Sequence, residues 1–287
     1  MKHADHAILL IHCPDAKGIV HAVTDFVLTN NGNIVKLDQH VDEDEERFFM
    51  RVEWELTDFT IPTEKISEFF ETLIAAKYDM RWQLRLGAHT PRVALFVSKY
   101  AHCFFDILSR YEAKELNIEI PLIISNHRKF EDYAQRFNIP FHYFPINRVN
   151  KQKMELEEIA LLKENNIDLI ILARYMQILS SQMTEAFPEQ IINIHHSSLP
   201  AFAGANPYGA AFKRGVKFMG ATSHYVTEDL DEGPIIAQDV VPITHRDSIA
   251  DMKRRGKDIE KTVLAKALYA HCTHNVLTYK NKTVVFD

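Results

Sequence analysis

The stretch Arg92-Val-Ala-Leu-Phe-Val-Ser98 is a short apolar run with no polar residue at alternate positions. A strand without polar alternation is usually buried on both faces, as in a parallel sheet. Similar runs recur along the chain, separated by helix-like stretches: Ile120–Ser125, Phe141–Phe144, Leu169–Ala173 and Ile191–His195. Because alternating strands and helices favour right-handed crossovers, we predict an α/β fold with a Rossmann-like, doubly wound and mostly parallel sheet.

The residues before this region show a different order of elements. Strand-like runs and runs with helical spacing follow one another as strand, helix, strand, strand, helix and strand: Ala7–Cys13, Ile19–Asn30, Asn33–His40, Phe48–Trp54, Thr63–Lys77 and Met80–Leu86. This βαββαβ order is typical of a ferredoxin-like domain. Because Gly87-Ala-His-Thr-Pro91 interrupts the pattern, we predict a first domain of residues 1–86, a linker of residues 87–91 and a second domain of residues 92–287.

The bulk composition indicates a cytoplasmic protein. The chain has 287 residues and a formal charge of −6, which gives no electrostatic reason to expect a nucleic acid or an anionic membrane as partner. Cys13, Cys103 and Cys272 form no CxxC pair, so neither a zinc knuckle nor a disulfide framework is indicated. The N-terminus lacks the apolar region of a signal peptide, and the apolar runs are too short to span a bilayer.

The stretch Asn193-Ile-His-His-Ser-Ser-Leu-Pro-Ala-Phe202 begins at the end of a predicted strand and continues into a proline-containing loop. Doubly wound sheets bind ligands beyond the carboxyl ends of their strands. Asn193 and His195 are two residues apart, so their side chains share one face of the strand. An asparagine can donate an N–H to an oxyanion, and a histidine can move protons near neutral pH.

A second polar stretch, His224-Tyr-Val-Thr-Glu-Asp-Leu-Asp-Glu-Gly-Pro234, places a histidine on a strand ahead of a loop rich in carboxylates. A carboxylate beside His195 would raise the pKa of the imidazole and hold its orientation. Asn, His and Asp together could then activate a nucleophile and stabilise a tetrahedral intermediate. The pattern alone also permits a solvated acidic turn and a purely structural Asn-x-His. No familiar metal-ligand spacing occurs, so we expect no metal site.

Three separated pieces of this region resemble, in order, the signature of the folate-dependent formyltransferase family. They are Asn193-Ile-His195 with Ser197 and Leu199-Pro200, then Gly220 with Thr222, then Leu230-Asp-Glu-Gly-Pro234. The resemblance covers roughly Arg92 to the C-terminus. It implies that Asn193 donates to the formyl oxygen, that His195 shuttles a proton, and that Asp231 orients and charges His195.

The segment Leu172-Ala-Arg-Tyr-Met-Gln-Ile-Leu-Ser180 resembles the part of this family that lines the pterin pocket. The resemblance implies a folate pocket formed by this segment and the acidic loop: Met176, Gln177, Ile178, Leu179, Glu228, Asp229, Leu230 and Gly233. It further implies that 10-formyltetrahydrofolate is the substrate and that no separate cofactor is used.

The N-terminal pieces Cys13-Pro-Asp-Ala-Lys-Gly-Ile-Val20 and Asn31-Gly-Asn-Ile34 resemble an ACT domain. Fusion of an ACT domain to a formyltransferase-like domain resembles the formyltetrahydrofolate deformylase branch. That resemblance implies hydrolysis of 10-formyltetrahydrofolate to formate and tetrahydrofolate, which supplies formate for purine synthesis and balances one-carbon pools. It implies a homo-oligomer, either a tetramer or a dimer, and a glycine or methionine effector at Asp15, Gly18 and Asn33. The alternative is that this domain serves dimerisation alone.

Departures from the family pattern bear on the acceptor. Transferases that act on glycinamide ribonucleotide carry a glycine-rich phosphate loop where this chain has Ser98-Lys-Tyr-Ala-His-Cys103, and a proline where it has His196. Within the deformylase branch we expect an aromatic residue at Ser198 and a histidine near Gly209, so the outer wall of the pocket differs. The alternatives are a formyltransferase to a small amine acceptor and an inactive amino-acid sensor that binds folate.

Overall fold

The computed structural model describes residues 5–87, 89–200 and 207–286, in which the chain forms two compact units. The first unit comprises Met1–Thr90 with Thr273–Tyr279 and Val284–Asp287, and the second comprises Pro91–Cys272 with Lys280–Thr283. The predicted second domain of residues 92–287 therefore differs at its C-terminal end, where two segments pack with the N-terminal sheet. Residue 88 of the predicted linker and residues 201–202 of the predicted site loop lie outside the described residues.

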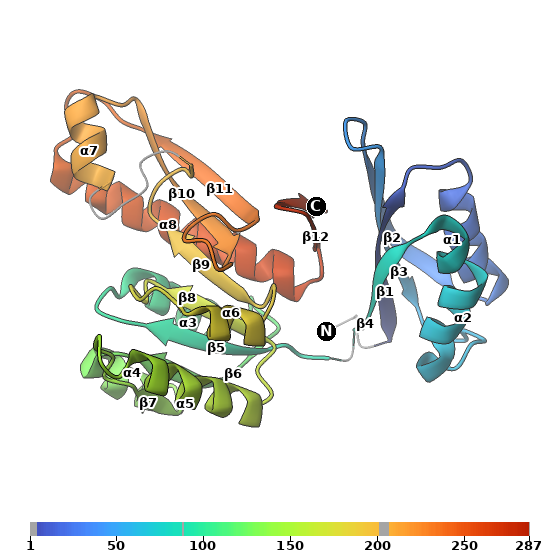
Figure 1. Ribbon diagram of the computed structural model, residues 1–287, viewed down its shortest axis with the longest axis horizontal. Coiled ribbons are helices and arrows are strands. Elements are labelled where there is room, and N and C mark those ends of the chain that lie inside the picture. Colours follow the sequence, from blue (N-terminus) through green and yellow to red (C-terminus); the bar gives the residue numbers. More distant parts are fainter. Residues whose placement is uncertain (1–4, 88, 201–206, 287) are drawn as a thin grey trace. The chain divides into compact units, whose positions relative to one another are not determined.

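The first unit is a four-stranded antiparallel sheet with two α-helices. Its elements are β1 (His6–Pro14), α1 (Ile19–Thr29), β2 (Asn33–Asp42), β3 (Arg47–Glu55), α2 (Ile66–Leu73) and β4 (Arg81–Leu86). The strand order is β2-β3-β1-β4, with β1 antiparallel to both of its neighbours (Figure 1). This order confirms the predicted ferredoxin-like βαββαβ fold.

The predicted helix over Thr63–Lys77 is wrong as a single element. The segment begins with a 3-10 turn at Thr63–Lys65, continues as α2, and ends with a second 3-10 turn at Ala75–Tyr78. The backbone leaves the helical region at Ile74, where φ is −125°. This break brings Ala75 into the core while Leu73 stays 56% exposed. Helical periodicity alone does not predict that the smaller residue is buried and the larger one exposed.

Both faces of the first sheet are covered. On one face, Phe26 of α1 and Phe70 of α2 contact each other edge to face at 5.5 Å and pack over the buried Trp54 of β3. On the other face, Leu10 and Phe49 form a cluster with Leu277 of β12 (Val276–Tyr279) and with Phe286, which follows β13 (Lys282–Val285). The C-terminal residues thus complete the core of the first unit.

The second unit is a seven-stranded sheet with helices on both faces. Its strands are β5 (Arg92–Val97), β6 (Glu119–Ser125), β7 (Phe141–Tyr143), β8 (Leu169–Ala173), β9 (Ile191–His195), β10 (Phe218–Tyr225) and β11 (Ile235–Pro242). Its helices are α3 (His102–Glu112), α4 (Glu131–Arg136), α5 (Lys151–Glu164), α6 (Ser181–Ala186), α7 (Pro207–Arg214) and α8 (Ile249–Cys272). No helix in the described ranges has the length and apolarity needed to cross a membrane.

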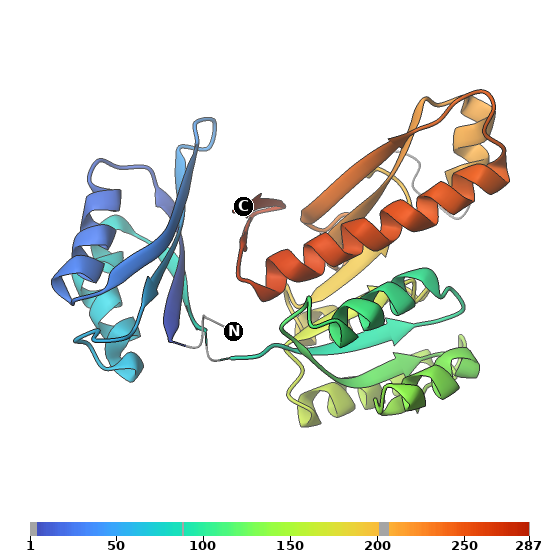
Figure 2. The ribbon, with the colours of Figure 1, turned by 180° about the vertical axis from the view of Figure 1, so that it is seen from behind.

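The strand order β11-β10-β9-β8-β5-β6-β7 confirms the predicted doubly wound sheet. The strands from β5 to β9 run parallel, and β10 and β11 continue the sheet antiparallel. One face packs against α5 and α6 through Ile159, Leu162 and Met183, while Figure 2 shows the long α8 lying along the sheet. Because the chain leaves β5 and β8 in opposite directions across the sheet, a crevice is expected at their carboxyl ends.

Candidate active site

Asn193 and His195 lie in the C-terminal half of strand β9, at the carboxyl edge of the parallel strands. The adjacent strand β10 runs antiparallel, with Thr222 opposite His195 and His224 opposite Asn193. The structure therefore brings the two polar stretches of the sequence together through strand pairing. His195 is buried, with 6% of its surface exposed, and Asn193 is partly buried.

Asp231 reaches His195 from the loop after β10. Its Oδ2 atom lies 3.1 Å from Nδ1 of His195. Because a carboxylate can only accept, Nδ1 carries the proton, and the neutral ring then offers Nε2 as a base. Nε2 of His195 is buried and has no hydrogen-bond partner within the described structure. The predicted pairing of His195 with Asp231 is thus present in the geometry, and one ring nitrogen is left for a substrate.

The backbone of the acidic loop presents the Asp231 carboxylate. Asp231 has a φ of 58°, a left-handed conformation that is uncommon for residues other than glycine. Two residues later, a Cβ on Gly233 would collide with the carbonyl oxygen of Tyr225, so glycine permits the close return of the loop to β10. The hydrogen bond from His195, together with the nearby imidazole of His224, holds the pKa of Asp231 well below its usual range, so this carboxylate stays charged.

His224 is a site residue that the sequence analysis placed on a strand but did not assign a role. It is 2% exposed, and its Nδ1 donates to the carbonyl oxygen of Tyr225 at 2.9 Å. Its Nε2 lies 3.3 Å from Nδ2 of Asn193 and 3.6 Å from Oδ1 of Asp231. With the Nδ1 proton directed at the Tyr225 carbonyl, Nε2 can accept an N–H of Asn193, which fixes the orientation of that amide. The structure reveals this role through strand register, because His224 pairs directly with Asn193.

The turn after His195 is held by one buried hydroxyl. Oγ1 of Thr222 donates to the carbonyl oxygen of Ser197 at 2.8 Å and accepts from the backbone N–H of Leu199 at 3.0 Å. Nε2 of Gln238 donates to the same hydroxyl at 2.9 Å. These bonds fix the backbone that follows His195. Ser198, where an aromatic residue is expected, lies against Gly220, since a Cβ at position 220 would meet its Oγ.

A pocket opens beside these residues, between the segment after β8 and the acidic loop. Its lining includes most of the predicted folate residues and several that were not predicted: Leu172, Gln177, Ile178, Leu179, Asn193, His224, Val226, Thr227, Glu228, Leu230 and Asp231. Among the described lining residues the predicted Met176, Asp229 and Gly233 do not appear. The apolar side chains of Ile178 and Leu230 are 59% and 60% exposed, so the pocket presents apolar surface to solvent.

A second polar cluster lies behind His195. The ring of His196 is 5.1 Å from the ring of His195 and 5.8 Å from that of Tyr208. Tyr208 donates to Oε1 of the buried Glu260 at 2.7 Å. Burial, followed by the charges of Arg174 and His195, lowers the pKa of His196 to about 4, so this imidazole is neutral at physiological pH.

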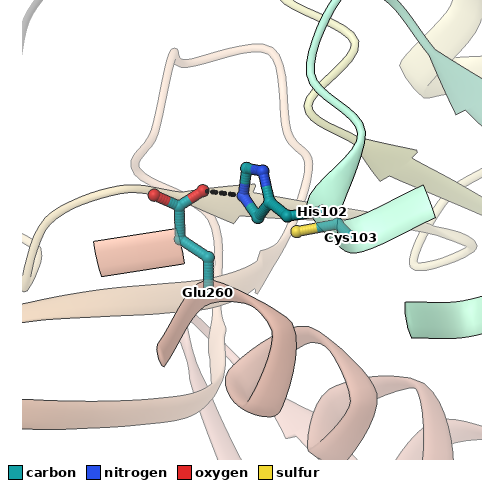
Figure 3. A group of neighbouring side chains, drawn as sticks. All are labelled: His102, Cys103 and Glu260. Carbon is teal, nitrogen blue, oxygen red and sulfur yellow. Dashed lines mark hydrogen bonds and ion pairs between the residues drawn. The ribbon is translucent and has the colours of Figure 1, made fainter. Parts of the chain in front are cut away.

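Figure 3 shows Glu260 hydrogen-bonded to His102, with Cys103 beside them. These three side chains place ligand atoms within 4.8 Å of one another, a spacing compatible with a metal ion. However, Glu260 already accepts from His102 and Tyr208 and lies 3.4 Å from Nε of Arg174. Burial raises the pKa of the Cys103 thiol well above its usual range. A guanidinium and a protonated thiol favour a hydrogen-bonded network over a cation site.

The predicted effector residues separate into two places in the first unit. Asp15 and Gly18 lie in the turn after β1, and Gly18 has a φ of 92°. Asn33 starts β2 and donates to Oε2 of Glu55 at 2.9 Å. Since Pro14 pairs with Arg47 whereas His6 and Asn33 both pair with Glu55, Asn33 lies at the opposite end of the sheet from Asp15. Within one chain these residues do not form a common pocket.

A family model described as formyl transferase matches residues 91–268. The formyltetrahydrofolate deformylase of Synechocystis sp. is 49% identical over 280 residues, which cover 98% of this chain and 98% of that protein. The chain belongs to the formyltetrahydrofolate deformylase family. The family member of Bacillus subtilis is 44% identical over 99% of this chain and 94% of its own length.

The solved structure of a formyltetrahydrofolate deformylase from Pseudomonas syringae pv. tomato matches this fold with a TM-score of 0.95 and 43% identity. The match covers 98% of this chain and 94% of that one. Similarity to the deformylase family therefore extends through both units, whereas the formyl transferase model is confined to residues 91–268. The resemblance of the first unit to an ACT domain stays a prediction.

Proposed function

We propose that the chain hydrolyses 10-formyltetrahydrofolate to formate and tetrahydrofolate. The observation that carries the proposal is the convergence of Asn193, His195 and Asp231 beside a pocket lined by residues after β8 and β10. These side chains supply an oxyanion donor, a base and a carboxylate that orients the base. The reaction balances with water as the only second reactant, and the proposed steps use these three side chains alone.

The first step is attack of water on the formyl carbon. His195 Nε2 takes a proton from the water as its oxygen bonds to that carbon, and the electron pair of the C=O bond moves to the formyl oxygen. Asp231 stabilises the imidazolium that forms, since it faces Nδ1 at 3.1 Å. An N–H of Asn193 stabilises the oxyanion, a type of contact that contributes about 3 kcal/mol in other enzymes.

The second step breaks the bond between the formyl carbon and the folate nitrogen. The electron pair on the oxyanion reforms the C=O bond, and the C–N pair leaves with the nitrogen. His195 returns its proton to that nitrogen, which yields tetrahydrofolate, and formic acid ionises to formate. The buried His224 keeps the Asn193 amide aimed at the formyl oxygen through both steps.

We further propose that the chain works as a cytoplasmic homo-oligomer, a tetramer or a dimer, whose ACT-like unit responds to glycine or methionine. Because Asp15 and Gly18 lie at one end of the first sheet and Asn33 at the other, a single effector could contact all three only where two copies meet. Isothermal titration with each amino acid tests the effector. Absence of heat together with unchanged activity would leave dimerisation as the role of this unit.

The decisive experiment measures formate release from 10-formyltetrahydrofolate with no amine present, for the wild type and His195→Ala. We expect formate from the wild type and loss of nearly all of it in the variant. His142→Ala is the matched control, because His142 lies in β7 at the far edge of the same sheet. No formate from the wild type, together with tight folate binding, would favour transfer to a small amine acceptor.

A further inference from the structure

Two fully buried carboxylates lie one turn apart on α5. Glu155 is 1% exposed and Glu158 is 0% exposed, whereas Glu157 between them has 49% of its side chain exposed. Glutamates are almost never fully buried without partners. The mechanism above uses neither of them, so their burial calls for a separate explanation.

Each carboxylate holds one end of the segment that lines the folate pocket. Tyr175 donates its hydroxyl to Oε1 of Glu158 at 3.0 Å, and the backbone N–H of Ser180 donates to Oε1 of Glu155 at 3.1 Å. Residues 176–179 lie between these anchors, and three of them line the pocket. One helix therefore holds both ends of the pocket loop.

The loop has a conformation that needs such support. Arg174 and Met176 have φ values of 63° and 62°, so left-handed residues other than glycine stand on both sides of Tyr175. Such residues persist only where the surrounding structure holds them in place. Tyr175 is 1% exposed and packs edge to face on Phe96 at 5.1 Å, so its hydroxyl has a fixed direction toward Glu158.

The second oxygens of the two carboxylates are also informative. Oε2 of Glu155 and Oε2 of Glu158 are buried and have no partner in the described structure. Burial raises the pKa of Glu158 to about 8. The hydrogen bond from Tyr175 opposes this shift, and the neighbouring charge of Glu155 acts in the same direction as burial. Glu158 therefore carries a proton at neutral pH. Residues three apart on a helix are neighbours, which is why the charge of Glu155 acts on Glu158.

Three charged or titratable groups of the described chain act on the pair or face it. Glu158 faces Glu155 on its own helix and Tyr175 from the loop. Nζ of Lys151 lies 3.9 Å from Oε1 of Glu155. With one proton between them, the two glutamates carry a single negative charge near one ammonium group. Without it they carry two charges in an apolar surrounding, which is costly.

We propose that Glu155 and Glu158 act as positioning residues that share one proton. Together they form a clamp that holds both ends of the folate-binding loop of residues 176–179, through Tyr175 and Ser180. This inference rests on the proposed function of the pocket. Because the folded protein retains a proton that the unfolded chain loses, the stabilising contribution of Glu158 decreases as pH rises toward about 8. Above that pH the clamp weakens, and the affinity of the loop for folate falls.

The test measures KM and kcat for 10-formyltetrahydrofolate between about pH 7 and about pH 9.5, a range that spans this titration. We expect the wild-type KM to rise several-fold above about pH 8 with kcat little changed, because only ground-state positioning is lost. Glu158→Gln should keep a low KM throughout, since its amide permanently supplies the N–H that replaces the shared proton. Glu157→Gln, the exposed neighbour on the same helix, should behave as the wild type.

A wild-type KM that stays flat across this range, or a rise that persists in Glu158→Gln, would overturn the proposal. Tyr175→Phe gives an independent test, because it removes the link between loop and clamp at every pH. We expect its KM to be several-fold above wild type already at neutral pH, and an unchanged KM would also contradict the clamp. Direct titration with tetrahydrofolate gives the same comparison as a binding constant, and circular dichroism verifies folding.

This design separates the clamp from the reaction itself. If the wild type releases no formate at neutral pH, the proposed function fails regardless of the variants. If the wild type releases formate and Tyr175→Phe binds tetrahydrofolate as tightly as the wild type does, only the clamp fails.

Discussion

At the scale of single residues, Asp231 lies beside two imidazoles, those of His195 and His224. The hydrogen bond from His195 and the nearby imidazole of His224 lower the pKa of Asp231, so it stays ionised in the pH range where the reaction runs. Asp231→Asn should leave the fold intact but remove the partner that sets the His195 tautomer. We expect kcat to fall by roughly 10²- to 10⁴-fold, as for orienting carboxylates of this kind.

The formate assay checks this prediction. Glu232→Gln is the control, because it removes one exposed charge from the adjacent position of the same loop. Near-normal turnover in Asp231→Asn would refute the proposed role of the carboxylate, whereas a loss shared equally by both variants would indicate a general charge effect.

His224 provides a second prediction at this scale. His224→Phe keeps a ring in the buried position but removes the acceptor for the Asn193 N–H at 3.3 Å. With the Asn193 amide free to rotate, we expect kcat to fall about tenfold or more while KM changes little, since oxyanion contacts act mainly in the transition state. His142→Phe, on β7 of the same sheet, is the matched control. A change confined to KM would place His224 in folate binding instead.

At the scale of elements, the loop from Val226 to Gly233 depends on a single close approach. A Cβ at Gly233 would collide with the Tyr225 carbonyl oxygen, whereas a Cβ at Gly215 would meet nothing within 4 Å. Gly215→Ala still incurs the strain of a φ of 69°, about 1 to 2 kcal/mol. We expect Gly233→Ala to cost more stability than Gly215→Ala and, unlike it, to reduce formate release, because the loop carries Asp231.

Urea unfolding followed by circular dichroism measures the stability difference, and the formate assay measures the effect on the loop. Equal activity losses in the two glycine variants would mean that the loop tolerates a side chain at position 233.

How far elements could be predicted from the sequence depends on how they are buried. The strands β5, β6, β8 and β9 were located because a strand buried on both faces is continuously apolar. Strand β10 buries Thr222, Ser223 and His224, and Thr222 and His224 make specific hydrogen bonds, so its polar pattern did not identify it as a core strand. The contact of His224 with Asn193 depends on this pairing, which no local pattern encodes.

At the scale of the whole molecule, prediction and structure differ at the C-terminus. We predicted that residues 92–287 form the second domain, whereas Thr273–Tyr279 and Val284–Asp287 belong to the first unit. Asn193, His195 and Asp231 were predicted as site residues because three separated pieces resemble a family signature in order. The C-terminal segments have no comparable signal. Leu277 and Phe286 pack on Leu10 and Phe49 of the first unit, and contacts between residues so far apart in the chain follow from the folded topology rather than from local composition.

The packing of Phe286 on the first sheet leads to a prediction about the stability of the first unit. Phe286 is 2% exposed, whereas its neighbour Val285 is 37% exposed and serves as the control. Both tryptophans of the chain, Trp54 and Trp82, lie in the first unit, so urea unfolding followed by tryptophan fluorescence reports on that unit. Phe286→Ala should lower its free energy of unfolding by about 3 kcal/mol, and Val285→Ala by less than about 1 kcal/mol. An unshifted tryptophan transition in Phe286→Ala would mean that the C-terminal segment does not complete the first core, and the predicted domain of residues 92–287 would then stand.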